Sequence, residues 1–212
     1  MQIVWNMQQR SYIAAGDYKS MNFSELRKSR VAGAISTIKE ICRSEAIVSR
    51  ETLARIEAEL RKLAAHPELF PADEFGISAT DKIVLYRLSE DDDHKFALYY
   101  QVANTPASVP PHNHTTWACI AGISGVEENT LYDSTNGGEP TVSKKTSVSA
   151  GESISLMPDD IHSIAINGPE PFSNLHLYGL ALDRLFDRVF WNETSQAWEP
   201  SSPVTNIVDR RD

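Results

Sequence analysis

The sequence predicts a mainly β protein, a jelly-roll sandwich or barrel with N-terminal α-helices packed outside it. The first third of the chain has apolar side chains at helical spacing, whereas after Ala79 short β-rich runs follow one another, separated by turn signals. No helical pattern interrupts these runs, and about eight of them suit a jelly roll. We therefore expect a helical segment, residues 1–79, packed on a barrel with a C-terminal extension, residues 80–212, in a single globular domain.

Two amphipathic helices are expected before residue 66. Ser24 and Ser49 are suited to N-cap positions, and apolar side chains recur at helical spacing after each of them. The dipeptide His66–Pro67 ends the second helix, because proline disfavours the α conformation in the residue before it. Met21 offers a second possible start of the chain, in which case residues 1–20 would be an unstructured extension.

The β-rich part of the chain is expected to contain strands rich in β-branched and aromatic residues. The expected strands are residues 82–88, 95–102, 113–120, 126–132, 141–148, 154–156, 161–166 and 174–180. The run 134–138, Ser-Thr-Asn-Gly-Gly, predicts a turn. The tail after Asp183 mixes charged and aromatic residues and is expected to close one end of the barrel.

Composition and charge are those of a globular chain with an acidic surface. Of 212 residues, 41% are hydrophobic and 23% are charged, and the net charge is −9. An acidic surface repels phosphate backbones and anionic lipids, so nucleic acid and membrane are poor partners. Cys42 and Cys119 do not make a disulfide framework, and no export signal is evident. These features favour two free thiols and a cytoplasmic location.

The segment from Pro110 to His114 carries the first candidate for chemistry. His112 and His114 are two residues apart on an extended segment, where both side chains point to one face. Both imidazoles can therefore reach one ion, and imidazole suits iron, zinc, copper and nickel. Taken alone the pattern is weak, because histidine is often only a satisfied polar group.

A second motif follows about fifty residues later. From Gly151 the chain has a short β run, a proline turn at Pro158 and then His162. With His112 and His114, this pattern resembles the cupin superfamily and, within it, the cysteine dioxygenase family of thiol dioxygenases. The resemblance covers roughly residues 82–191. It is closest to the bacterial branch, whose members act on cysteine, 3-mercaptopropionate or mercaptosuccinate.

The resemblance implies that His112, His114 and His162 bind one Fe²⁺. Ordinary cupins add a glutamate ligand four or five residues after the second histidine, where this chain has Ala118 and Cys119. Three neutral ligands leave the full 2+ charge on the metal, and a substrate thiolate then supplies the missing negative charge. For this reason the missing carboxylate favours thiol dioxygenases over the iron enzymes with two histidines and one carboxylate.

Further catalytic residues are implied by the same resemblance. Asn174, His176 and Tyr178 share one face of a strand, and Asn174 stands where the family has a serine in a hydrogen-bonded relay. Tyr178 is expected to present its hydroxyl to the active site, oriented by His176. Cys119 aligns with the cysteine that some members crosslink to this tyrosine through a thioether. Strand alternation opposes the crosslink unless a bulge intervenes after His114. The alternative is a buried free cysteine that has only a packing role.

Two arginines are candidates to hold the carboxylate of the substrate, because guanidinium binds carboxylate through paired hydrogen bonds. Arg87 matches the arginine of cysteine dioxygenases. Arg188 resembles the C-terminal arginine of the mercaptopropionate branch, with Arg184 as a rival. Two arginines at one site would suit a dicarboxylic thiol such as mercaptosuccinate, whereas the alternative for either arginine is a surface ion pair.

The expected function is therefore oxidation of a small thiol by O₂ to its sulfinate, in an enzyme that is a monomer or a homo-oligomer. A non-catalytic cupin that senses a small ligand is one alternative. Another metal-dependent cupin enzyme, such as an isomerase, is a second, although it would usually retain the glutamate. An oxidase of N-terminal cysteines on proteins is a third, and it would not need an arginine for the carboxylate.

Overall fold

The computed structural model describes residues 22–43, 47–133, 137–169 and 171–211, in which two six-stranded sheets form a sandwich. The first sheet runs, in spatial order, through β12 (Ile207–Asp209), β1 (Ile83–Ser89), β2 (Lys95–Ala103), β9 (Phe172–Leu180), β4 (Ala118–Ser124) and β7 (Ser153–Leu156). The second runs through β11 (Ala197–Pro200), β10 (Val189–Asn192), β3 (Ala107–His112), β8 (Ile161–Ile166), β5 (Glu127–Tyr132) and β6 (Val142–Val148). The predicted jelly roll is confirmed, as a sandwich of two sheets rather than a closed barrel.

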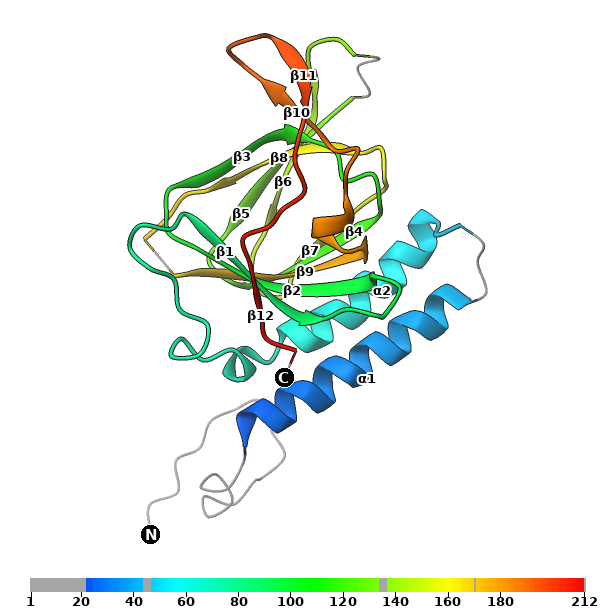
Figure 1. Ribbon diagram of the computed structural model, residues 1–212, viewed down its shortest axis with the longest axis vertical. Helices are drawn as coiled ribbons and strands as arrows, with labels where there is room; N and C mark the ends of the chain where they lie inside the picture. The colour runs from blue at the N-terminus through cyan, green and yellow to red at the C-terminus, as the bar shows by residue number, and fades with distance from the viewer. Residues whose placement is uncertain (1–21, 44–46, 134–136, 170, 212) are drawn as a thin grey trace.

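Two helices cover the outer face of the first sheet. Helix α1 (Phe23–Arg43) packs on α2 (Arg50–Ala64), and α2 contacts β4, β7 and β9. Figure 1 shows both helices on one side of the sandwich, with the β10–β11 hairpin at the opposite end. The Ser49 hydroxyl accepts a hydrogen bond from the Thr52 backbone N–H, so the predicted N-cap of α2 is confirmed. Short 3₁₀ turns follow at η2 (Pro67–Leu69) and η3 (Leu182–Arg184).

Strand alternation in the first sheet separates two hydrophobic layers. Side chains on its outer face, such as Cys119 and Leu177, pack with Leu53 and Ile56 of α2. Side chains on its inner face, such as Tyr178, face the second sheet. Successive residues of a strand point to opposite faces, so each strand contributes to both layers. The inner layer also contains the polar groups described below.

The strand prediction missed β3 and the C-terminal strands. Pro110 and Pro111 lie inside β3, and proline cannot donate a ladder hydrogen bond, so this segment did not resemble a strand. The predicted strand 113–120 begins later, at Ala118, because the chain turns at Thr115, whose φ is 56°. Residues 1–20, and most of the predicted turn at 134–138, lie outside the described residues. None of the helices in the described ranges is both long and apolar enough to cross a membrane.

The close packing of β4 can be tested by a substitution at Gly122. A Cβ atom at this position would collide with the backbone carbonyl of Ser149, which crosses the strand there. We expect Gly122→Ala to lower the free energy of unfolding in urea by about 1–3 kcal/mol. Gly33→Ala is the control, because a Cβ on this residue of α1 meets nothing within 4 Å. It should raise stability by about 0.5–1 kcal/mol, and equal effects of the two variants would contradict the close packing.

Candidate metal site

Three histidines converge at the inner side of the second sheet. His112 is the last residue of β3 and pairs directly with His162 of the neighbouring antiparallel strand β8. The chain then turns at Thr115 and leaves His114 in the connection to β4. The His112 and His114 ring centroids lie 4.8 Å apart, and those of His112 and His162 4.6 Å apart. One nitrogen from each ring lies within 4.8 Å of the others, and all three rings are buried.

Hydrogen bonds leave ring nitrogens of this triad free for a metal. His112 Nδ1 lies 2.8 Å from the carbonyl oxygen of Pro110, which only accepts, so this nitrogen carries the proton and Nε2 keeps its lone pair. His162 Nδ1 lies 2.7 Å from Asn129 Oδ1. His162 Nε2 and His114 Nδ1 are buried without any hydrogen-bond partner in the described structure. Buried polar atoms rarely stay unpaired, so this donor set fits a metal ion that imidazole binds.

The electrostatics of the triad also favour metal binding. Burial, helped by the positive charge of Arg188, lowers the pKa of His112 to about 3. Burial and the neighbouring histidines hold the pKa of His114 and that of His162 well below the ordinary value. All three imidazoles are therefore neutral at pH 7, which is the form that binds metal.

Tyr178 and His176 of β9 lie beside the triad. The Tyr178 hydroxyl lies 3.0 Å from His176 Nδ1, and its ring centroid lies 5.7 Å from that of His114. Burial raises the pKa of Tyr178 well above its ordinary value, so the hydroxyl keeps its proton and can donate. Burial lowers the pKa of His176 to about 3. Asn174 shares this face of the strand, but its amide donates to Glu127, at 2.8 Å.

Cys119 lies on the other face of the sheet from Tyr178, which contradicts the possible thioether and favours the alternative of a buried free cysteine. Ala118 is the residue of β4 that pairs with Tyr178, whereas Cys119 pairs with Leu177. Its sulfur lies 4.0 Å from the carbonyl oxygen of Leu53, in the layer beneath α2. The turn at Thr115 does not change which face of β4 the cysteine occupies. Cys119 is a buried free thiol whose pKa burial raises well above its ordinary value, and nothing in this arrangement supports a bond to Tyr178.

Arg188 is the cation that the structure brings to the triad. It is buried just before β10, where its Nε donates to the carbonyl oxygen of Asn113 at 3.2 Å. Its guanidinium lies 5.0 Å from the ring centroid of Phe190, which stacks on His112. Within the described residues no carboxylate pairs with it, and burial lowers its pKa. The rival Arg184 is exposed.

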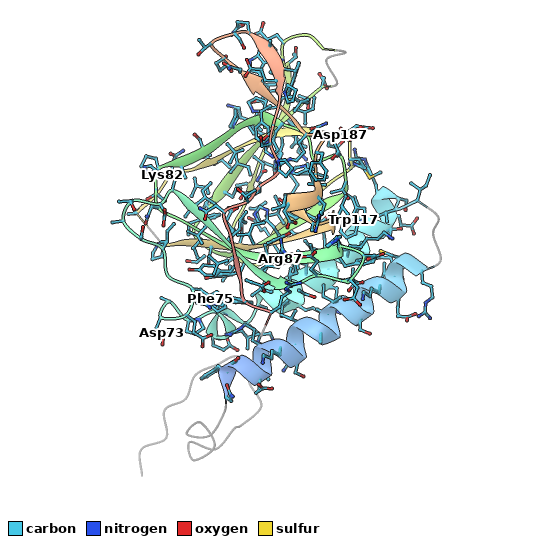
Figure 2. The ribbon with its side chains drawn as sticks, in the orientation of Figure 1. Asp73, Phe75, Lys82, Arg87, Trp117 and Asp187 are labelled. Carbon is cyan, nitrogen blue, oxygen red and sulfur yellow. The ribbon has the colours of Figure 1, made fainter. Side chains whose placement is uncertain are left out.

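Arg87 is already paired with two carboxylates. Its Nη1 lies 2.7 Å from Glu90 Oε2, and its Nη2 lies 2.9 Å from Asp183 Oδ2. The guanidinium lies 5.7 Å from the ring centroid of Tyr99, and that ring in turn contacts Tyr178. Figure 2 shows Arg87 among the strands near the helices, while Asp187, the neighbour of Arg188, lies toward β10. Tyr99 therefore stands between Arg87 and Tyr178.

Two polar residues of the site, Glu127 and Asn129, were missed by the sequence analysis. They alternate on β5 and face inward beneath the triad, where both are buried. The sequence offered one signal, the alternation of these two polar residues on an expected strand. It did not indicate that this strand pairs with the strand of His162. Burial raises the pKa of Glu127 to about 7, although hydrogen bonds from Asn129 and Asn174 oppose the rise.

Comparisons with known proteins give structural likeness alone. No protein-family model matches the chain, and no curated protein matches it. An uncharacterized conserved protein with a double-stranded β-helix domain from Klebsiella pneumoniae is 18% identical, over 53% of this chain and 84% of its own, with a TM-score of 0.42. A cupin superfamily protein from Desulfitobacterium hafniense is 14% identical, over 52% and 89%, with a TM-score of 0.41.

A third similar structure is the cupin domain of Cnp3 from Schizosaccharomyces pombe. It is 11% identical, over 50% of this chain and 71% of its own, with a TM-score of 0.40. Likeness at this level does not identify an activity. The topology and the buried triad themselves define a jelly-roll protein with a candidate metal site of three histidines.

The buried imidazoles predict that the metal-free protein is destabilised by acid. An unfolded histidine takes up a proton as the pH falls through about 6.5, whereas His112 and His176 in the fold do so only near pH 3. Stability is therefore lost as the pH falls below 6.5, by about 2 kcal/mol for each such imidazole between pH 7.5 and 5. Glu127, with its raised pKa, offsets part of this loss because the fold binds its proton more tightly.

Urea unfolding of chelator-treated protein at pH 7.5 and pH 5 measures this loss. His66→Gln is the control, because it removes an imidazole that is partly exposed rather than buried. A metal-free protein that is equally stable at both values would show that these imidazoles are not buried in neutral form.

Proposed function

We propose that this protein is a non-haem iron(II) thiol dioxygenase that converts a small mercapto-carboxylate and O₂ to the corresponding sulfinate. The observation that carries the proposal is a buried triad of neutral histidines bordered by a protonated phenol, Tyr178, and by a guanidinium, Arg188, that pairs with no carboxylate among the described residues. The sequence resemblance to thiol dioxygenases supports the same reaction. In it both oxygen atoms join the sulfur of the thiolate, and no water or proton is consumed.

Different residues of the site would bind the metal, bind the substrate and orient it. Iron(II) held by His112, His114 and His162 would supply the redox chemistry and an open position for the thiolate sulfur. Arg188 would hold the carboxylate of the substrate, and it is suited to this because a buried cation without an anion is costly. Tyr178 would donate a hydrogen bond into the site, held in place by His176.

The apolar surroundings would keep water from the reacting sulfur. Leu156 is fully buried in the inner layer and belongs to the same cluster as Tyr178. Trp117, which follows the histidine pair in the sequence, packs instead against the layer on the helix side. The inner layer is therefore the apolar wall that this proposal uses.

A single guanidinium at the site without a carboxylate partner among the described residues favours a thiol with one carboxylate. Arg87 already has two carboxylate partners, and Tyr99 separates it from Tyr178. A dicarboxylic thiol such as mercaptosuccinate would need Arg87 to exchange these partners for the substrate. We therefore place cysteine and 3-mercaptopropionate ahead of mercaptosuccinate as substrates.

Oxygen uptake by iron(II)-loaded protein tests the proposed reaction. We expect uptake with cysteine or 3-mercaptopropionate and a product heavier than the thiol by two oxygen atoms, as measured by mass spectrometry. A His162→Ala variant is the control, because it removes one ligand of the candidate site and should abolish uptake. If protein that contains iron consumes no oxygen with any of the three thiols, the ligand-sensing cupin becomes the better interpretation.

Substitution of each arginine separates the two candidate anchors. We expect Arg188→Gln to lower kcat/KM by about 10–100-fold, because a charge-assisted hydrogen bond to a carboxylate contributes about 1.5–3 kcal/mol. Arg87→Gln should mainly lower the melting temperature, because it removes the guanidinium that pairs with both Glu90 and Asp183. Exposed Arg184→Gln is the matched control. A larger loss of kcat/KM in Arg87→Gln than in Arg188→Gln would reverse the assignment.

A further inference from the structure

Glu127 is a buried carboxylate at the centre of a polar network beneath the triad. Its side chain is fully buried on β5 and has no lysine or arginine partner in the described chain. Oε1 accepts a hydrogen bond from Asn129 Nδ2 at 2.9 Å, and Oε2 accepts one from Asn174 Nδ2 at 2.8 Å. Oε2 also lies 3.9 Å from His176 Nε2. Burying a carboxylate without a cationic partner costs free energy, which indicates that Glu127 has a functional role.

The direction of the hydrogen bonds links Glu127 to a ligand of the candidate metal site. Both side-chain oxygens of Glu127 accept hydrogen bonds, so the NH₂ group of Asn129, and not its carbonyl oxygen, lies toward Glu127. The carbonyl oxygen of that amide then faces away from Glu127, toward His162 Nδ1 at 2.7 Å. An acceptor at this point requires the proton of His162 to lie on Nδ1. The unpaired Nε2 therefore carries a lone pair toward the triad.

We propose that Glu127 is a positioning residue for the metal site, which acts through Asn129 to fix the proton and the orientation of His162. The proposal rests on the candidate metal site and is independent of the thiol chemistry. A reversed Asn129 amide would present its NH₂ group to His162 and favour the proton on Nε2, which blocks metal binding there. Outer residues that orient a histidine ligand typically change metal affinity by 10–100-fold when they are replaced.

Three variants test this mechanism by their affinity for zinc(II), measured by competition with a chromophoric chelator. Glu127→Met removes the acceptor while keeping the length of the side chain, and Asn129→Leu removes the partner of His162. Each should weaken zinc(II) binding by about 10–100-fold. Because Glu127 acts through Asn129, the double variant should bind zinc(II) no more weakly than Asn129→Leu alone. Losses that multiply in the double variant would overturn the proposal.

Glu127→Gln separates the effect of the orientation of the Asn129 amide from the effect of the Glu127 charge. Because it nearly preserves the shape of the side chain, it also provides a second variant if Glu127→Met fails to fold. Glutamine keeps one acceptor oxygen for Asn129, and Asn174, whose Oδ1 has no partner, can turn its amide to accept from the new NH₂ group. We therefore expect Glu127→Gln to bind zinc(II) more tightly than Glu127→Met. Equal losses in both variants would mean that the charge alone matters, and would overturn the role of Asn129.

Ile166→Val is the matched control for general damage to the interior. Ile166 is buried and pairs directly with Glu127 across the neighbouring strand. It should keep the affinity of the unchanged protein for zinc(II) within threefold, whereas a loss equal to that of Glu127→Met would overturn the proposal. If the unchanged protein does not bind zinc(II), both the metal site and the proposal fail. Tight binding that depends on Glu127, without oxygen uptake on any thiol, would contradict only the proposed function.

Discussion

Every polar side chain buried between the two sheets must find a partner, and this requirement organises the interior. Water is excluded there, so an unpaired imidazole, amide or carboxylate would cost about 1–3 kcal/mol or more. Three imidazoles are placed together by the direct pairing of β3 with β8 and by the turn at Thr115. Hydrogen bonds satisfy Nδ1 of His112 and Nδ1 of His162, and one nitrogen from each of the three rings lies within 4.8 Å of the others. Unpaired nitrogens of His114 and His162 therefore lie together within a polar layer that hydrogen bonds otherwise satisfy in large part.

The parts of the fold that could be predicted from the sequence are those whose signal is local. The Ser49 cap, the ends of α2 and most of the inner strands follow from periodicity and turn residues. The histidine pattern at 112 and 114 was also local, and the later histidine was found through a motif. Strand β3 was missed because it contains two prolines, which are unusual in a strand. The strand pairs with β8 at the residues on either side of these prolines, which keep their backbone N–H groups.

Contacts between distant strands were beyond the reach of sequence reasoning. Glu127 and Asn129 matter because β5 pairs with β8, and nothing near them in the sequence indicates this register. The two arginines could not be ranked for the same reason. Arg87 matches a family position, yet its partners Glu90 and Asp183 come from a turn and from η3, whereas Arg188 reaches the triad through β10. For Cys119, strand parity was a better guide than alignment with the family.

The position of Glu127 also bears on the missing glutamate ligand. A carboxylate bound directly to the metal would neutralise half of its charge and weaken its attraction for a second anion, such as a thiolate. A carboxylate placed behind Asn129 cannot occupy a coordination position, because Asn129 lies between it and His162. In the proposed function the ligand set therefore stays neutral and open to an anionic substrate, while Glu127 acts through Asn129 on a histidine of the candidate metal site. This arrangement is consistent with a site in which the substrate thiolate, and not a carboxylate of the protein, is the anionic ligand of the metal.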